Sequence, residues 1–297
     1  MSNRTHTRRD FLKNAAASAA AGALFLNAPE ELAPQAGAKS RVILIRNRNL
    51  LDAGGAPRKE VVRQMLDDAV ASLLGEKEPL TAWRRLVKPS DVVGVKTNEW
   101  SYLRTPVEVE DAIKRRIMDA GVPAGNISIS DRGVRGDDIF EKATALVNVR
   151  PMRTHHWAGV GSLIKNYIVF SRLPFTHHGD SCADLAEIWS FPEIRGKTRL
   201  NILVMFTPLF HGIGPHHFNR TYVWPYQGLL VGTDPVAVDS TGVRILLAKR
   251  RRYFREDRPL SPPPKHVFLA DTRHHLGTAD PNRIELVKLG WKDDVLI

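Results

Sequence analysis

Short apolar runs rich in β-branched residues alternate along this chain with segments whose apolar residues recur at helical spacing. The run RVILIR at 41–46 is typical of a strand. The segment 57–74 places apolar side chains on one helical face, with a proline near its start and a glycine just after its end. Further strands are predicted at 91–96, 126–130, 200–205, 228–231 and 284–289, and further helices at 80–87, 106–120, 137–143 and 236–247. This alternation predicts an α/β protein with a mixed, mostly parallel sheet flanked by helices.

The chain is long enough for one large domain, and nothing in it requires two. Its 297 residues contain no internal repeat and no linker long enough to separate domains. Hydrophobic residues make up 43% and charged residues 25% of the sequence, which is typical of a folded globular protein. We therefore expect a single α/β domain over residues 39–297.

Cysteine content and charge restrict the cofactors and partners. The single cysteine, Cys182, cannot form an internal disulfide or hold an iron–sulfur cluster, which needs several thiolates. The formal net charge of +11 favours an acidic partner such as an anionic small molecule or an acidic surface. The densest basic run, KRRRYFR at 249–255, is typical of the solvated end of a helix. No nucleic-acid-binding motif occurs, so a nucleic acid is not the expected partner.

Residues 1–38 have the three-part pattern of an export signal. A basic segment precedes an alanine-rich apolar stretch from Ala15 to Leu26, and the small-residue sequence AGA follows at 36–38. The apolar stretch is shorter than the roughly 20 residues needed to span a bilayer. Arg8 and Arg9, followed by DFLK, closely resemble the twin-arginine export motif.

This pattern predicts where the protein acts. We expect the twin-arginine translocation machinery to recognise residues 1–38 as a signal peptide and to export the folded chain to a periplasmic or other extracytoplasmic location. The signal is either cleaved after Ala38 or retained. No transmembrane helix is expected in the mature chain.

Histidines occur in four adjacent pairs, at 155–156, 177–178, 216–217 and 274–275. Histidine is a common metal ligand and carries protons near neutral pH. Neighbouring side chains on a strand point to opposite faces, so usually one member of each pair can face a common site. No pair has the i, i+4 spacing of a helical zinc motif, so a metal site would have to be assembled from distant loops.

Two groups of lysine and asparagine indicate a polar site. Lys96 and Asn98 lie at and just past the end of a predicted strand, where open α/β sheets bind ligands. A lysine there can bind an anion, and an asparagine can both donate and accept hydrogen bonds. Lys165 and Asn166 interrupt an otherwise largely apolar run. Because a buried lysine without a partner is costly, Lys165 either extends to the surface or contacts an acid or an anionic ligand.

The segment GTDPVAVDS contains two aspartates in different settings. Asp234 precedes a proline where a strand turns into a helix, which favours a helix cap, and a ligand-binding role stays open beside it. Asp239 lies one turn into that helix among apolar neighbours, and we expect it to face Lys165 or a metal. Walker A, GxGxxG and GxSxG motifs are absent from the sequence, which removes the usual support for nucleotide binding and serine-hydrolase chemistry.

Taken in order, the segments VKTN, RTHHWAGVGSLIKN, LPFTHHGD, HGIGP and GLLVGTDPVAVDSTGVRIL resemble the family named domain of unknown function 362. The resemblance covers about residues 41–250, and its most specific parts are the Lys-Asn segment and the Gly-x-Asp-Pro-x-Ala-x-Asp stretch. It implies functional weight at Lys96, Asn98, His155, Lys165, Asn166, His178, Pro215, Asp234 and Asp239.

Three departures limit what the resemblance implies. Arg153 stands where the family has a lysine before Thr-His, which keeps the charge but not the geometry. The aspartate that many members carry after the strand before the Gly-Pro loop is missing from LNILVMFTP. Some relatives have ferredoxin-type cysteine clusters, which this chain cannot form, so a redox role does not transfer. The family label implies no settled activity.

Together these residues predict an exported protein that binds an anionic small molecule, with or without a divalent metal, in a cleft of Lys, Asn, His and Asp side chains. The predicted ligand-binding residues are Lys96, Asn98, Arg153, Asn166 and Asp234. The predicted catalytic residues are His155, His178, Lys165 and Asp239, and His155, His178 and Asp239 are also the predicted metal ligands. Whether the protein is an enzyme stays open. The alternatives are a non-catalytic periplasmic binding or cofactor-assembly protein, and adhesion to acidic surfaces through the net positive charge.

Overall fold

The structure, a computed structural model, describes residues 38–212 and 218–297. Its strands are β1 (Ser40–Arg46), β2 (Val93–Lys96), β3 (Ile127–Ser130), β4 (Ala145–His155), β5 (Gly159–Gly161), β6 (Thr198–Leu209), β7 (Gly228–Gly232) and β8 (Ile284–Gly290). Its α-helices are α2 (Lys59–Leu74), α3 (Pro79–Leu86), α4 (Val107–Asp119), α5 (Asp138–Glu141), α6 (Leu163–Asn166), α7 (Gly179–Cys182), α8 (Pro235–Phe254) and α9 (Lys265–Thr272).

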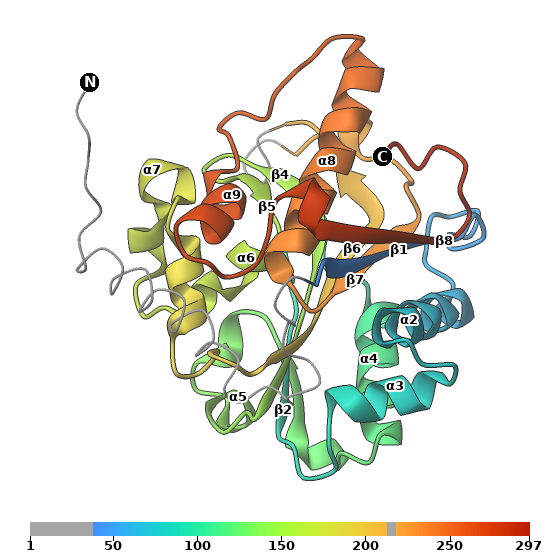
Figure 1. Cartoon of the computed structure of the whole chain (residues 1–297), viewed down its shortest axis with the longest axis vertical. Helices are drawn as coiled ribbons and strands as arrows, with labels where there is room; N and C mark the ends of the chain where they lie inside the picture. The colour runs from blue at the N-terminus through green and yellow to red at the C-terminus, as the bar shows by residue number, and fades with distance from the viewer. Residues whose placement is uncertain (1–37, 213–217) are drawn as a thin grey trace.

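An eight-stranded sheet forms the centre of the described part of the chain (Figure 1). Its strands follow the order β3-β2-β4-β6-β7-β1-β8, and the short β5 pairs with β4. The strands β3, β2, β4 and β6 run parallel to one another, and β8 runs parallel to β1. Strand β7 is antiparallel to both of its neighbours, β6 and β1. The predicted α/β fold with a mixed, mostly parallel sheet is confirmed.

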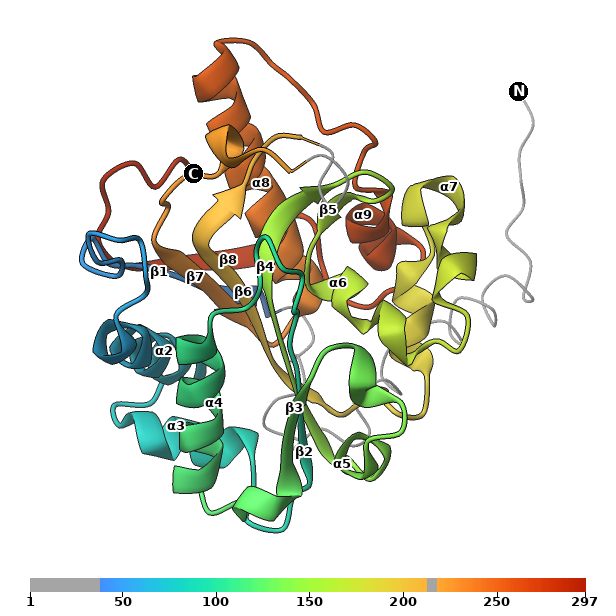
Figure 2. The same ribbon diagram turned by 180° about the vertical axis from the view of Figure 1, so that it is seen from behind.

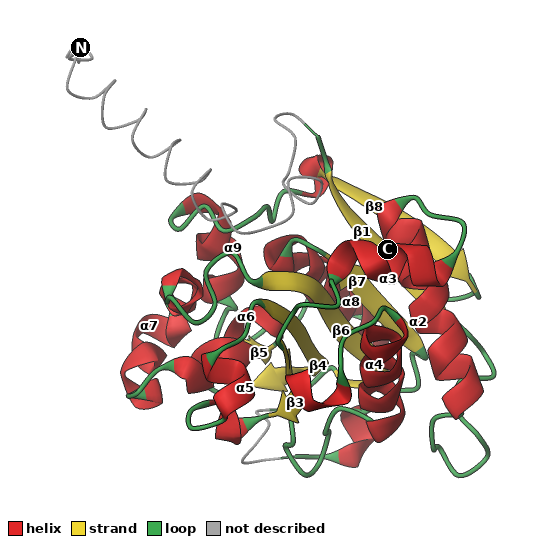
Figure 3. Cartoon of the chain, turned by 90° about the horizontal axis from the view of Figure 1, so that it is seen from below, coloured by secondary structure: helices red, strands yellow, loops and turns green. Residues whose placement is uncertain are grey.

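Helices cover both faces of the sheet. Helices α2, α3 and α4 lie on one face, and α5, α6, α8 and α9 lie on the other (Figure 1, Figure 2); the view from below shows the sheet between these two layers (Figure 3). Successive side chains of a strand point to opposite faces, so a central strand covered on both sides is apolar on both. In β4, Val147 packs into the core under α2–α4, whereas Leu146 packs into the core under α6 and α8.

The central strand β4 is not predicted by the sequence patterns. Pro151 lies within its sequence ALVNVRPMRTH, and a proline cannot donate a backbone hydrogen bond to a neighbouring strand, so it argues against a central strand. The structure accommodates this proline because the register between β4 and β6 shifts between Pro151 and Arg153. The predicted strand 200–205 and helix 236–247 are also longer than expected, ending at Leu209 and Phe254.

Some predictions concern residues outside the described ranges. All but the last residue of the predicted signal peptide precede residue 38, and Pro215 falls in the gap at 213–217 with the pair His216 and His217. Among the helices of the described ranges, none is both long enough and apolar enough to cross a membrane.

Candidate functional site

A row of polar side chains crosses three neighbouring strands on the face that α6 covers. Lys96 of β2, Asn148 of β4 and Asn201 of β6 occupy positions that pair across the strands. Asn148 donates from Nδ2 to Oδ1 of Asn201 (3.1 Å) and to the carbonyl oxygen of Leu163 (3.1 Å). Asn166 of α6 donates to Oδ1 of Asn148 (2.9 Å) and to the carbonyl oxygen of Lys96 (3.1 Å). These bonds fix α6 to the sheet and explain how a polar Asn166 is tolerated inside an apolar run.

Lys96 is fully buried at the end of β2 and forms an ion pair with Asp131, just past the end of β3. Its Nζ lies 2.6 Å from Oδ1 of Asp131, whose second oxygen accepts the backbone N–H of Glu99 at 2.9 Å. Burial lowers the pKa of Lys96 to about 8, and the charge of Asp131 opposes this change. Burial alone would raise the pKa of Asp131, but Lys96, the backbone N–H of Glu99 and the charge of Arg150 together hold that pKa below its ordinary value. The predicted anion-binding Lys96 therefore already has a carboxylate partner in the protein.

Arg150 and Arg153 extend from the second half of β4 and are only 3% and 5% exposed. Arg150 donates from Nη1 to the carbonyl oxygen of Ser162 at 3.1 Å. Arg153 donates from Nη1 to Oδ1 of Asn98 at 2.9 Å, and its guanidinium lies 4.4 Å from the ring centre of Trp100. The Nε atom of each arginine has no hydrogen-bond partner among the described residues. Burial lowers the pKa of Arg150 to about 10 and that of Arg153 well below its ordinary value.

Lys165 contacts His178 and Cys182 rather than the polar row. Its Nζ lies 3.1 Å from Nε2 of His178 and 3.8 Å from Sγ of Cys182. An ammonium group only donates, so His178 accepts through Nε2 and donates from Nδ1 to the carbonyl oxygen of Phe175 (3.3 Å). Lys165 is 5% exposed, and burial lowers its pKa to about 8. The side chain therefore lies inside the protein instead of extending to the surface.

His155 is held as a neutral imidazole at the end of β4. Its Nδ1 accepts the backbone N–H of Trp157 at 3.2 Å. Burial first, and then the charge of Lys165, lower the pKa of His155 far below its ordinary value, with Arg150 and Arg153 adding to the effect. A neutral ring that accepts through Nδ1 carries its proton on Nε2, so the free edge of His155 is a hydrogen-bond donor.

The two predicted aspartates both cap helices. Asp239 is fully buried and accepts hydrogen bonds from Ser162 Oγ (2.6 Å) and from the backbone N–H groups of Leu163 and Ile164 (both 2.9 Å), at the start of α6. Burial raises the pKa of Asp239 to about 6, against these hydrogen bonds. Its contacts are with the backbone beside Lys165, not with the Lys165 side chain.

Asp234 begins α8 in the way its position before Pro235 predicts. Its Oδ1 accepts the backbone N–H groups of Val236 (2.8 Å) and Ala237 (3.0 Å). Its Oδ2 accepts hydrogen bonds from Ser40 Oγ (2.7 Å) and the backbone N–H of Thr278 (2.9 Å). The carboxylate is therefore engaged with α8, β1 and the segment before β8.

We expect Asp234→Ala to lower the free energy of unfolding by about 2 kcal/mol, the upper end for loss of a helix cap, because four hydrogen bonds are lost together. Anion affinity should stay unchanged. The matched control is Asp280→Ala, which removes the cap of a single short turn at 281–283 and should have a smaller effect. Urea unfolding and a phosphate titration measure both quantities. Loss of binding with stability intact would show that Asp234 contacts the ligand instead.

Positive charge exceeds negative charge in this part of the core. Lys96 pairs with Asp131, but Arg150, Arg153 and Lys165 form no ion pair within the described ranges. We call these last three residues together with His155 the cationic site. Arg150, Arg153 and His155 lie in the part of β4 that extends past the end of β2, toward the edge of the sheet where the sequence predicts ligand binding, and Lys165 lies on α6.

The predicted metal ligands do not come together. Asp239 is engaged with α6, and His178 lies against Lys165. Within the described ranges, a different group, Asp184, Glu187 and His274, has ligand atoms that all lie within 4.8 Å of one another. It is a possible metal-binding group near the surface. Its Asp184 also accepts a hydrogen bond from Arg273 at 2.6 Å, so a cation of the protein already neutralises that carboxylate.

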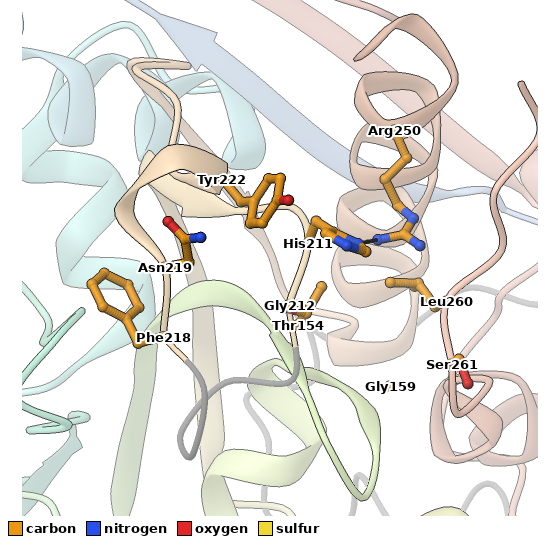
Figure 4. A pocket seen from close by; sticks show the side chains of 10 residues that line it. All are labelled: Thr154, Gly159, His211, Gly212, Phe218, Asn219, Tyr222, Arg250, Leu260 and Ser261. Carbon is orange, nitrogen blue, oxygen red and sulfur yellow. Dashed lines mark hydrogen bonds between the residues drawn. The ribbon is translucent and has the colours of Figure 1, made fainter. Parts of the chain in front are cut away.

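A cavity of about 560 Å³ is lined in part by Thr154, the residue between Arg153 and His155, but none of the four residues of the cationic site lines it (Figure 4). Hairpin residues Thr154 and Gly159 lie on one side of it, and Arg250 lies on another next to His211. Arg250 is already engaged, because its guanidinium donates to three backbone carbonyl oxygens and contacts Nδ1 of His211 at 2.9 Å. The protein itself therefore holds the guanidinium of Arg250.

Fold and site together define an α/β protein with buried cations at the carboxyl ends of its parallel strands. Residues 103–244 match the family described as Domain of unknown function (DUF362). The matched segment contains the cationic site and both capping aspartates, whereas Lys96 and Asn98 precede it. It is shorter than the predicted resemblance over 41–250, and it confirms a domain of this family at 103–244. No curated protein and no solved structure matches the chain significantly.

Proposed function

We propose that this protein binds a small oxyanion at the cationic site. The observation that carries the proposal is the burial of Arg150, Arg153 and Lys165 without an ion pair among the described residues. The charges of Asp131 and Asp239 offset the burial of Arg150 in part, but its pKa still lies below its ordinary value. Moving a charged group from water into a protein interior costs several kcal/mol unless an opposite charge compensates it. A bound anion would supply that compensation, so the unliganded protein carries a cost that the ligand removes.

The directions of the hydrogen bonds favour an anion over a metal cation. Within the described ranges both arginines have an unpartnered Nε–H donor. The Lys165 ammonium also donates, and His155 donates from Nε2. Asp239, the carboxylate that the sequence offered as a metal ligand, instead accepts hydrogen bonds from the start of α6. A cation placed among these groups would meet donors and positive charge, whereas an oxyanion would meet complementary partners.

The same donors define what the site would do in a reaction. They would stabilise negative charge that develops on a bound ligand, and such stabilisation usually contributes most to catalysis of this kind. His155 suits this donor role better than that of a general base, since its accepting nitrogen is already used. His178 would hold Lys165 in place. A non-catalytic binding or cofactor-assembly protein needs the same site, and saturable binding without consumption of the ligand would favour it.

We further propose that the protein acts outside the cytoplasm. Arg8 and Arg9 followed by an alanine-rich stretch support export by the twin-arginine machinery. Replacing both arginines with lysine in the full chain should leave the protein in the cytoplasm, as measured by cell fractionation. Normal export of that variant would reject this localisation.

A pH series tests the oxyanion proposal. Phosphate affinity, measured by calorimetry at constant ionic strength, should fall by about tenfold per pH unit above pH 8 as Lys165, with a pKa of about 8, loses its proton. Stability of the unliganded protein should move the other way. Burial lowers the pKa of Lys165 from 10.5, so between pH 8 and 10.5 the unfolded chain binds more protons and the Lys165 contribution to stability rises with pH.

The control for this series is Lys165→Met. In this variant, neither phosphate affinity nor the stability of the unliganded protein should show the change with pH that titration of Lys165 causes. Lys96 also has a pKa of about 8, so the difference between wild type and variant isolates Lys165. Binding to acidic surfaces through the overall charge would instead fall with salt and persist in the variant. Phosphate affinity that stays constant up to pH 10 would contradict a role for Lys165 in binding.

A further inference from the structure

His266 is a buried histidine whose ring nitrogens have no partners in the described part of the chain. It lies in the first turn of α9 and is fully buried, and neither Nδ1 nor Nε2 has a hydrogen-bond partner among the residues that the structure describes. It falls outside the matched segment 103–244 and stands alone in the sequence rather than in a His-His pair. Leaving both nitrogens of a buried imidazole unpaired is costly, which indicates that a further group completes this region.

The start of α9 packs against the hairpin that carries the cationic site. A Cβ atom on Gly159 of β5 would lie 2.4 Å from the carbonyl oxygen of Pro262, so the two backbones are in direct contact. On the other side, Lys265 forms an ion pair with Asp180 of α7. Figure 2 shows α9 between β5 and α7. His266 is therefore placed between the β4–β5 hairpin and the segment that contacts Lys165.

Other unpaired polar atoms belong to the same region. Nε of Arg150, Nε of Arg153 and Oγ1 of Thr154 are buried without partners in the described ranges. Burial lowers the pKa of His266 to about 3, and the positive charges of Lys165 and Arg150 contribute to this shift. His266 is therefore neutral at physiological pH and lies within the electrostatic reach of the cationic site.

A neutral imidazole has one N–H donor and one accepting nitrogen. The donor can bond to an oxygen of a bound anion, but the accepting nitrogen needs an O–H group, which a fully ionised oxyanion lacks. We propose that His266 contacts the ligand of the cationic site and that this ligand is an oxyanion carrying a hydroxyl group. This inference rests on the proposed function and adds to it a contact from α9 and the chemical class of the ligand.

Inorganic phosphate and sulfate provide the test, because the two anions have the same shape but only phosphate carries an O–H group at neutral pH. We expect wild type to bind phosphate about tenfold or more tightly than sulfate, measured by calorimetry at pH 7 and constant ionic strength. Equal affinities would overturn this inference and leave the proposed function in place. Saturable binding of neither anion would overturn both.

Two variants assign the preference to His266. His266→Phe keeps a planar aromatic ring and removes both nitrogens, so phosphate affinity should fall to that of sulfate while sulfate affinity changes by less than about threefold. His266→Gln keeps one donor and one acceptor and should retain part of the preference. If His266 had a purely structural role, the substitutions would lower the affinities for phosphate and sulfate by the same factor, and that result would overturn the inference. If His266→Phe does not fold, the phosphate and sulfate affinities of wild type and of His266→Gln decide whether His266 contacts the ligand.

Discussion

Replacing Asp131 with asparagine is expected to lower the free energy of unfolding by about 3–5 kcal/mol. Asparagine keeps the shape of the side chain but removes the charge that compensates the fully buried Lys96, 2.6 Å away. Removing one partner of a buried ion pair leaves the other charge in a low-dielectric interior, which is the costly outcome. Urea unfolding at pH 7 measures the loss.

An exposed ion pair provides the control for this variant. Nε of Arg251 lies 2.5 Å from Oδ1 of Asp257, and 70% and 78% of these two side chains are exposed. Asp257→Asn should therefore change the free energy of unfolding by at most about 1 kcal/mol. The loss caused by Asp131→Asn should also shrink as the pH is raised, because Lys96 can then release its proton in the folded state. Equal effects of the two substitutions would contradict the burial of the Lys96–Asp131 pair.

Replacing Lys165 with methionine is expected to weaken phosphate binding by at least about 100-fold with stability unchanged or increased. The methionine keeps the length of the side chain and removes a buried ammonium whose neighbours are His178 and Cys182 rather than a carboxylate. An unpaired buried cation is unfavourable in the empty protein and favourable once an anion is bound, so the two measurements should move in different directions. Calorimetry and urea unfolding test them together.

Lys142→Met is the matched control, since it removes one positive charge from an exposed side chain whose ion pair with Asp138 lies at the surface. It should change phosphate affinity by less than about twofold, because exposed charges are screened by salt. If both lysine variants weaken binding equally, the overall charge of the protein and not the cationic site binds the anion. If Lys165→Met unfolds the protein, Lys165 has a structural role.

Hydrophobic periodicity predicts most of the fold and misses its central strand. The predicted strands at 41–46, 126–130 and 284–289 correspond to β1, β3 and β8. Strand β1 is an apolar run that is largely buried, whereas β3 and β8 are partly exposed strands at the two edges of the sheet. The missing strand, β4, contains Asn148, Arg150 and Pro151, all unusual in a buried strand. What makes it a strand is the partner on each side, β2 and β6, and pairing between distant segments is not encoded in local periodicity.

The candidate site is predicted in part. Lys165 lies close enough to His155 for its charge to lower the pKa of that histidine. Asp234 and Asp239 serve as helix caps, a role that competes with ligand binding for the same carboxylate oxygens. Asp131 is missed although its position just past a predicted strand is a usable signal, because parallel strands end at the same edge. Arg150 is not predicted as a site residue because it lies in β4. Without a prediction of that strand, nothing in the sequence places its side chain near the other site residues.

The most direct measurement is a crystal structure of the protein soaked with sodium arsenate and recorded at the arsenic absorption edge. Arsenate resembles phosphate in shape and carries an O–H group at neutral pH. We expect an anomalous peak among Arg150, Arg153 and Lys165, with arsenate oxygens within hydrogen-bonding distance of these side chains and one oxygen facing His266. A saturating arsenate concentration that leaves this position empty would contradict the central claim that the buried cations form an oxyanion site.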